Sequence, residues 1–221
     1  DLSDLQVKSY TADPATGVYI DTDVTLSAEA QNRNGAAVSY KFSVTNKNGG
    51  TSVVSDYSST NSVVWTPQTA GTYTITFDFK DTEGNENSRT TTVKVEDDSA
   101  LVKPIIKSVF PANNNLIKVN TPATVSVKAG GGKTGTNLLF YKYIVTDPNG
   151  VKNIPYYTLN STYSFTPTML GVYTVNVYVQ GSDNTTINKT YKYTATNSDV
   201  TVPTTAPVPA TTAPVPATTS P

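Results

Sequence analysis

The side chains with the greatest capacity for chemistry in this chain are its carboxylates, because the 221 residues contain no histidine and no cysteine. That composition excludes serine–histidine triads, thiol nucleophiles and most zinc sites. A pair of carboxylates could hydrolyse a glycosidic bond. The acidic residues fall mostly in predicted turns or at outward positions of predicted strands, however, where simple solvation explains them. We therefore interpret the chain as non-catalytic and expect it to need no cofactor.

One predicted turn gathers several oxygen-bearing side chains, and such turns can hold Ca²⁺. The stretch is also typical of a hairpin turn, because Gly84 and Asn85 tolerate positive φ. The corresponding stretch of the second half, 181–184, lacks most of the acids. We favour the hairpin turn and assign no metal site, with calcium as the alternative. The candidate calcium ligands are Asp81, Glu83, Asn85 and Glu86.

A glycine-rich stretch over 129–135 predicts a mobile loop. It contains Lys133 followed by Thr134, a pair that also occurs in phosphate-binding loops. The glycine spacing does not fit the GxxxxGK[ST] pattern, and no helix is predicted to follow and supply its N-terminal dipole. We therefore assign no phosphate site to this stretch.

The elements that must position these residues follow from one motif that the chain uses twice. An aromatic residue, Thr-Pro, three further residues and Gly-x-Tyr-Thr lead into a strictly alternating stretch. Gly71 and Gly171 are 100 positions apart, as are the other matched positions of the motif. Strict alternation predicts a half-buried β-strand, so the sequence predicts two copies of one β domain. The copies run WTPQTAGTYTITFDF over 65–79 and FTPTMLGVYTVNVYV over 165–179.

The rest of the chain fits the same domain type. Short alternating segments are separated by turn signals, and no stretch has the 3.6-residue apolar period of a helix. Together with the length of each copy, this is typical of an immunoglobulin-like sandwich. We predict an all-β chain of two tandem immunoglobulin-like (fibronectin type III-like) sandwiches over 1–97 and 104–197, with a short linker over 98–103. We also predict a disordered Thr/Pro-rich linker over 198–221, because TTAPVPA occurs there twice and favours an extended polyproline conformation.

The composition restricts partners and location. Hydrophobic residues make up 37% and charged residues 15% of the chain, a balance common in secreted β proteins. The net charge of −1 disfavours nucleic acid, and no apolar run approaches the 20 or so residues that a membrane span needs. A β domain without cysteine suits an extracellular bacterial protein. Because the first residue is Asp1 and no signal-like segment follows, we interpret the chain as a piece of something longer.

Several repeated residues are predicted to be structural. A tyrosine at the start of the penultimate strand of such a sandwich can bury its ring and return its hydroxyl to the backbone, as in the tyrosine corner. The glycine before it allows a tight entry to the strand. We therefore expect these residues to hold the interior together and not to contact a ligand. The structural residues are Tyr73, Tyr173, Gly71, Gly171, Trp65, Tyr40 and Tyr141.

The two copies differ on one predicted outer face. Alternation directs Phe140, Ile144 and Tyr178 of the second copy outward, on two strands expected to be neighbours. The first copy has serine or aspartate at these places, so only the second copy presents an apolar strip. Such a strip marks a contact surface for a protein, for the first domain folding back, or for a polysaccharide with Tyr156 as a further contact. We favour the first two, because sugar platforms need more flat aromatic side chains.

The repeated tyrosines also carry a family resemblance. Tyr40, Tyr57 and Tyr73, the Asp-Tyr-Ser-Ser segment over 56–59 and the W/F-T-P-x-x-x-G-x-Tyr-Thr motif resemble the triple-tyrosine (Y_Y_Y) immunoglobulin-like domains of bacterial extracellular proteins. The second copy matches with Tyr141, Tyr157 and Tyr173, but has Tyr-Tyr-Thr in place of Asp-Tyr-Ser. The Thr/Pro tail is similar to the linkers of clostridial cellulosomal and surface proteins.

The resemblance implies a non-catalytic module of sensors, cell-wall enzymes or surface proteins. We accordingly expect a spacer or protein-binding module of a bacterial multimodular protein, secreted or at the cell surface, and monomeric. Its partner would be another module of the same chain or a surface protein. The alternative is a carbohydrate- or cell-wall-binding module.

Overall fold

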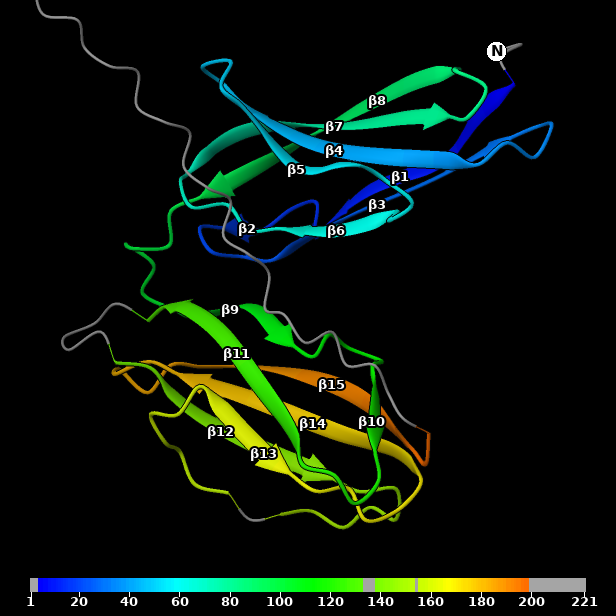
Figure 1. Ribbon diagram of the computed structural model, residues 1–221. Coiled ribbons are helices and arrows are strands. Elements are labelled where there is room, and N and C mark those ends of the chain that lie inside the picture. The colour runs from blue at the N-terminus through cyan, green and yellow to red at the C-terminus, as the bar shows by residue number, and fades with distance from the viewer. Residues whose placement is uncertain (1–3, 133–137, 154, 199–221) are drawn as a thin grey trace, which may run out of the picture. The chain divides into compact units, whose positions relative to one another are not determined.

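The computed structural model describes residues 4–132, 138–153 and 155–198, so Lys133 and Thr134 lie outside the described residues. Its folded residues divide into two compact units, one ending at Asp97 and the other beginning at Asp98 (Figure 1). The described residues form β-strands and turns, and none of them belongs to a helix that could cross a membrane. Each unit is a sandwich of two sheets, so the chain has the predicted tandem of immunoglobulin-like folds.

The first unit packs a three-stranded sheet against a five-stranded one. The smaller sheet has the order β1-β3-β6, with β1 over Leu5–Asp13, β3 over Val24–Asn32 and β6 over Ser62–Trp65. The larger sheet has the order β2-β8-β7-β4-β5. These strands are β2 over Val18–Tyr19, β8 over Glu86–Glu96, β7 over Gly71–Asp81, β4 over Val38–Asn46 and β5 over Thr51–Ser58.

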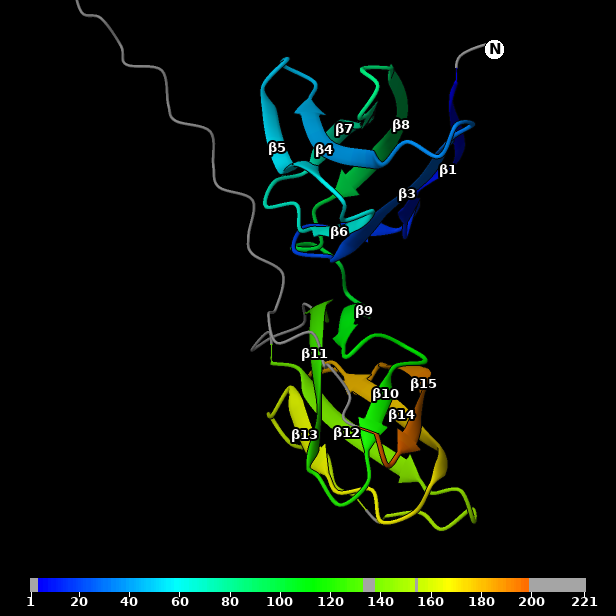
Figure 2. The same ribbon diagram turned by 45° about the vertical axis from the view of Figure 1, so that its right-hand side comes forward.

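The second unit has the same plan with one strand fewer. Its sheets have the orders β13-β11-β9 and β10-β15-β14-β12 (Figure 2). The first consists of β13 over Thr162–Phe165, β11 over Ala123–Gly131 and β9 over Pro104–Phe110. The second consists of β10 over Leu116–Lys118, β15 over Thr186–Thr196, β14 over Gly171–Gln180 and β12 over Phe140–Thr146.

The missing strand is the counterpart of β5. On the edge of β12 away from β14, the described residues form only two isolated bridges, Tyr141 to Thr158 and Thr146 to Lys152. Pro155 lies in this segment, and proline has no amide hydrogen to donate to a ladder. The segment is also one residue shorter than its equivalent in the first unit, and the difference lies after the turn that ends at Gly150.

The cores follow from the alternation of the repeated motif. Val175, Val177 and Val179 of β14 are fully buried, and the matching residues of β7 are at most 1% exposed. Burying each such side chain stabilises a fold by about 1.5–3 kcal/mol. The first unit uses phenylalanine where the second uses valine or tyrosine, so the two cores are filled differently.

The glycine-rich stretch is partly a strand, which corrects the predicted loop. Residues Ala129, Gly130 and Gly131 belong to β11 and pair with β9. A bulge next to them leaves Lys107 without a partner in the register, and its ammonium lies 2.9 Å from the Asp98 carboxylate. The side chains of Lys107 and Asp98 are 9% and 14% exposed. A Cβ on Gly130 would collide with both side chains of this ion pair, so a larger residue there would displace them.

Candidate binding surface

The outer face of β12 and β14 carries the residues predicted to make contacts. Tyr141, Tyr143 and Val145 are buried, so the residues between them point out of the sandwich. Tyr178 lies directly opposite Lys142 in the ladder. Phe140 and Ile144 pair with Gln180 and Asn176, which makes them diagonal neighbours of Tyr178, and all three are partly exposed.

Lys142 organises this face. Its ammonium lies 4.6 Å from the ring centre of Tyr178 and 4.6 Å from that of Tyr157. A cation over an aromatic face is attracted by the quadrupole of the ring, by about 0.5–1 kcal/mol at exposed sites. The result is a positive charge held between two tyrosines, with Phe140 and Ile144 beside Lys142 along β12. We call the five residues Phe140, Lys142, Ile144, Tyr157 and Tyr178 the Lys142 face.

Tyr156 is not part of this arrangement. The rings over Lys142 belong to its neighbour Tyr157 and to Tyr178. Tyr156 is 82% exposed, and Val151 and Leu159 on the same segment are 65% and 60% exposed. Three exposed apolar side chains therefore lie on the segment that follows β12, next to the Lys142 face.

The first unit has a different surface at the corresponding place. Lys41 lies 5.7 Å from the ring centre of Tyr57 and 4.0 Å from the Asp56 carboxylate. Asp78 occupies the position of Tyr178 and accepts a hydrogen bond of 2.8 Å from Ser88. The lysine and one tyrosine are thus common to both units, whereas the second ring belongs to the second unit.

The contacts predicted from the sequence do not include Lys142 or Tyr157 of the Lys142 face. Tyr157 is predicted there only as one of the repeated tyrosines. The repeat itself could have indicated Lys142, because Tyr-Lys-Phe and Tyr-Lys-Tyr place the lysine on the outer face between two inward rings. The pairing of Lys142 with Tyr178 depends on the register of two strands that are far apart in sequence.

The repeated tyrosines that begin β7 and β14 turn back to the preceding loop. The Tyr173 ring is 4% exposed, and its hydroxyl accepts hydrogen bonds from the amides of Thr168 and Met169 at 3.0 and 3.1 Å. The Tyr73 ring is partly buried, and its hydroxyl donates to the Thr69 carbonyl at 2.9 Å. Both contacts are local tyrosine corners.

The glycines before these tyrosines have positive φ, +156° at Gly71 and +123° at Gly171. A Cβ on Gly171 would also lie only 3.1 Å from Pro148. Side chains rarely adopt such a φ, so the strand entry of the second unit depends on glycine.

The other residues predicted to be structural are buried. Trp65 is 3% exposed, and its ring centre lies 5.0 Å from that of Tyr73. Tyr40 and Tyr141 are each 8% exposed, and burial raises the pKa of Tyr141. None of these three side chains joins the Lys142 face.

The acidic turn of the first unit is held by hydrogen bonds. The Asp81 carboxylate accepts bonds from the side-chain amides of Asn32 and Asn85, each of 2.8 Å, and from two backbone amides of the turn. Burial acts to raise the pKa of Asp81, but these hydrogen bonds outweigh it and lower the pKa. Glu86 pairs with Lys80 at 2.9 Å. Across the described residues, no three acidic side chains are close enough together to hold a metal ion.

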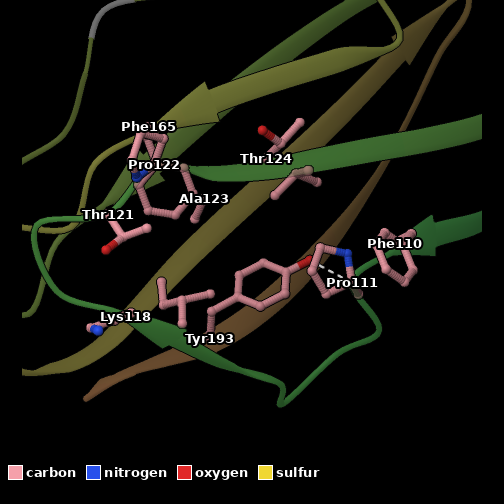
Figure 3. A pocket seen from close by; sticks show the side chains of 11 residues that line it. Phe110, Pro111, Lys118, Thr121, Pro122, Ala123, Thr124, Phe165 and Tyr193 are labelled. Carbon is pink, nitrogen blue, oxygen red and sulfur yellow. Dashed lines mark hydrogen bonds between the residues drawn. The ribbon is translucent and has the colours of Figure 1, made fainter. Parts of the chain in front are cut away.

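A cavity of about 330 Å³ opens between the two sheets of the second unit. Figure 3 shows the Tyr193 ring among the lining side chains, with its hydroxyl directed at Pro111. That hydroxyl donates to the Pro111 carbonyl at 3.0 Å. The mouth carries Thr121, Pro122 and Thr124, which are exposed. The remaining lining residues are Phe110, Ile117, Lys118, Ala123, Val125 and Phe165.

Comparison with known proteins finds no matching family model. The serine-rich adhesin for platelets of Staphylococcus aureus (strain USA300) is 26% identical over 143 residues, which are 65% of this chain and 6% of the adhesin. The fibronectin(III)-like modules of Clostridium thermocellum CbhA align with 15% identity and a TM-score of 0.33, over 85% of this chain and 94% of that one. Carbohydrate-binding modules of the β-sandwich superfamily align with 12% identity and a TM-score of 0.35, over 86% and 85% of the two chains. The chain thus spans a small part of the length of the adhesin that it matches.

Proposed function

We propose that the chain is a non-catalytic module of a secreted or cell-surface bacterial protein, and that its second unit contacts another protein through the Lys142 face. The observation that carries this proposal is the cation of Lys142 held between Tyr157 and Tyr178 on an exposed sheet. The similarity to a staphylococcal adhesin and the absence of cysteine support an extracellular setting. We assign the units to the triple-tyrosine type on their repeated tyrosines, and expect the Thr/Pro segment to act as a spacer.

The geometry favours protein over polysaccharide. A sugar stacks on the open face of an aromatic ring, and Lys142 lies over Tyr157 and Tyr178 where such a sugar would stack. The Lys142 ammonium, surrounded by aromatic and aliphatic side chains, is instead complementary to a protein surface that has a carboxylate among apolar side chains. Aromatic residues are also enriched in the energetically dominant parts of protein interfaces. We expect the chain to be monomeric and to bind a different protein.

One observation favours the alternative of carbohydrate binding. Tyr156 is 82% exposed, so its ring is accessible to a sugar. In that case Tyr156 would be the principal contact, and the Lys142 face would form the adjoining surface.

The two functions can be separated by binding of the fluorescently labelled chain. We would measure binding to platelets, the target in the name of the staphylococcal relative, and retention on cellulose, chitin and peptidoglycan. The Tyr178→Asp variant installs the residue of the first unit and should lower platelet binding at least tenfold, whereas Tyr156→Ala and the outward control Thr174→Ala should not. Equal binding by Tyr178→Asp would remove the Lys142 face from the interaction. Retention on a polysaccharide that Tyr156→Ala abolishes would establish the alternative.

A further inference from the structure

We propose that the cavity of the second unit is a docking site for the Pro-Val-Pro segments of the chain's own Thr/Pro tail, at 207–209 and 214–216. The proposed function assigns no role to this cavity. The proposal depends on the chemistry of the cavity, the composition of the tail and the position at which the tail leaves the second unit.

The cavity is built for an apolar, uncharged occupant. Its walls are mainly aromatic rings, prolines and aliphatic side chains, and its volume of about 330 Å³ lies at the lower end of the range for ligand sites. The one polar atom of Tyr193 is already engaged with Pro111. The Tyr193 ring is only 1% exposed, so the surface for packing comes from the partly exposed rings of Phe110 and Phe165 and from the exposed Pro122. A sugar would need several polar partners, and the lining supplies these only from Lys118 and two threonines at the mouth.

The tail has the matching composition. From Val200 to Pro221 it contains no charged residue, and TTAPVPA occurs in it twice. A proline ring packs on aromatic side chains without burying an unpaired amide, because proline has no N–H. Aromatic-lined grooves recognise proline-rich segments in this way, since the extended polyproline conformation loses little entropy on binding.

The tail begins next to the cavity. Strand β15 contributes Tyr193 to the lining and ends at Thr196. The Thr196 carbonyl accepts a hydrogen bond of 3.0 Å from the amide of Val119, and Val119 follows Lys118 of the lining. Pro207 is nine residues beyond Ser198, and nine extended residues reach about 28 Å at 3.1 Å per residue. A tether this short raises the effective concentration to the millimolar range.

The first unit has different residues at two positions of the cavity lining. Trp65 occupies the position of Phe165 and is 3% exposed, and Val93 occupies the position of Tyr193. The unit that the tail follows is thus the one with phenylalanine in place of Trp65 and tyrosine in place of Val93. The substitution Phe165→Trp copies the first unit and should narrow the cavity without adding a charge to the core.

The test compares NMR spectra of the full chain with those of a chain that ends at Ser198. The amides of Thr121, Ala123 and Thr124 should differ between the two, independently of protein concentration. Addition of the peptide TTAPVPATTAPVPA to the shorter chain should move the same signals toward their positions in the full chain, with half-saturation at or below about 1 mM. Replacing the four prolines at 207, 209, 214 and 216 by serine should abolish the difference, as should Phe165→Trp.

Three results would overturn the proposal. Identical spectra of the full and shortened chains, without a response to the peptide, would show that the cavity does not accept the tail. Differences that grow with protein concentration would assign the occupant to a second chain. Differences that persist in Phe165→Trp would place the tail elsewhere on the unit. Should Phe165→Trp fail to fold, Ala123→Leu can replace it, because Ala123 of β11 is the ladder partner of Phe165 and also lines the cavity. The spectra of its full and shortened chains should then be identical at Thr121 and Thr124.

Discussion

The side-chain amide of Asn153 donates a hydrogen bond of 3.1 Å to the backbone carbonyl of Tyr143. Its oxygen accepts a bond of 2.8 Å from the amide of Val145, and its nitrogen also donates to the Tyr163 hydroxyl at 2.9 Å. In the first unit β5 supplies backbone partners for the corresponding edge. One side chain therefore supplies part of the edge pairing that a strand supplies in the first unit, and it also joins β12 to β13 of the other sheet.

Replacing the Asn153 side chain should destabilise the second unit. We expect Asn153→Ala to lower the free energy of unfolding of the second unit by about 2–3 kcal/mol, because three hydrogen bonds of roughly 1 kcal/mol each are lost. Chemical denaturation followed by circular dichroism measures the change. Ser55→Ala, at the strand position that pairs with Phe42, is the matched control and should change stability by less than about 0.5 kcal/mol. Equal effects of the two substitutions would contradict a structural role for Asn153.

Two buried tyrosines of the second core should respond to the same substitution in opposite directions. The Tyr143 hydroxyl is buried and has no hydrogen-bond partner among the described residues, whereas the Tyr193 hydroxyl bonds to Pro111. An unsatisfied buried polar group costs about 1–3 kcal/mol. Tyr143→Phe, which copies Phe42 of the first unit, should therefore raise the melting temperature, and Tyr193→Phe should lower it. Destabilisation by Tyr143→Phe would indicate an ordered water or another partner at its hydroxyl.

The tyrosine corners provide a comparison between the units. The Tyr173 hydroxyl satisfies two backbone amides beneath a buried ring, and the Tyr73 hydroxyl bonds to one carbonyl and one hydroxyl at the surface. We expect Tyr173→Phe to cost about 1–3 kcal/mol and Tyr73→Phe to cost less, because water can replace the exposed contacts. Thermal melting of both variants gives the ranking, and a larger cost at Tyr73 would contradict it.

The alternation of β7 and β14 and the duplication of the sandwich could be predicted from the sequence, because a period of two residues directly determines which side chains are buried. The Lys142 face could be predicted only in part, since Tyr178, Phe140 and Ile144 follow from that period but the ring of Tyr157 does not. The segment that carries Tyr157 contains Pro155 and is not a regular strand, so alternation does not predict where the Tyr157 ring points.

The ion pair of Asp98 and Lys107 could not be predicted in the same way. It depends on a bulge in β9, which redirects Lys107 toward the interior. A bulge is a property of the pairing between two strands, and the alternation of one strand does not reveal it. The cavity near Phe165 lies where the first unit has the larger ring of Trp65, and the alternation of the strands does not reveal it.

The last prediction concerns alkaline pH, to which the second unit should be the more sensitive. Burial raises the pKa of Tyr191 to about 12 and raises the pKa of Tyr143 and Tyr193 as well. The first unit has Phe42, Thr91 and Val93 at these places. Tyrosines of the unfolded chain ionise near pH 10. The raised values therefore contribute stability that is complete below about pH 10 and is lost as the pH rises through the folded pKa, which for Tyr191 is about 12.

The two units can be followed separately, because the single tryptophan, Trp65, lies in the first. Between pH 10 and 12 the circular dichroism signal of the second unit should fall while Trp65 fluorescence keeps its folded emission. Tyr191 contributes less than the roughly 2–3 kcal/mol of the full shift, because its side chain is partly exposed and screened by solvent. Tyr191→Phe removes that group and should move the alkaline transition of the second unit to higher pH. Simultaneous loss of both signals would show instead that the two units unfold together or that the first is equally sensitive to alkali.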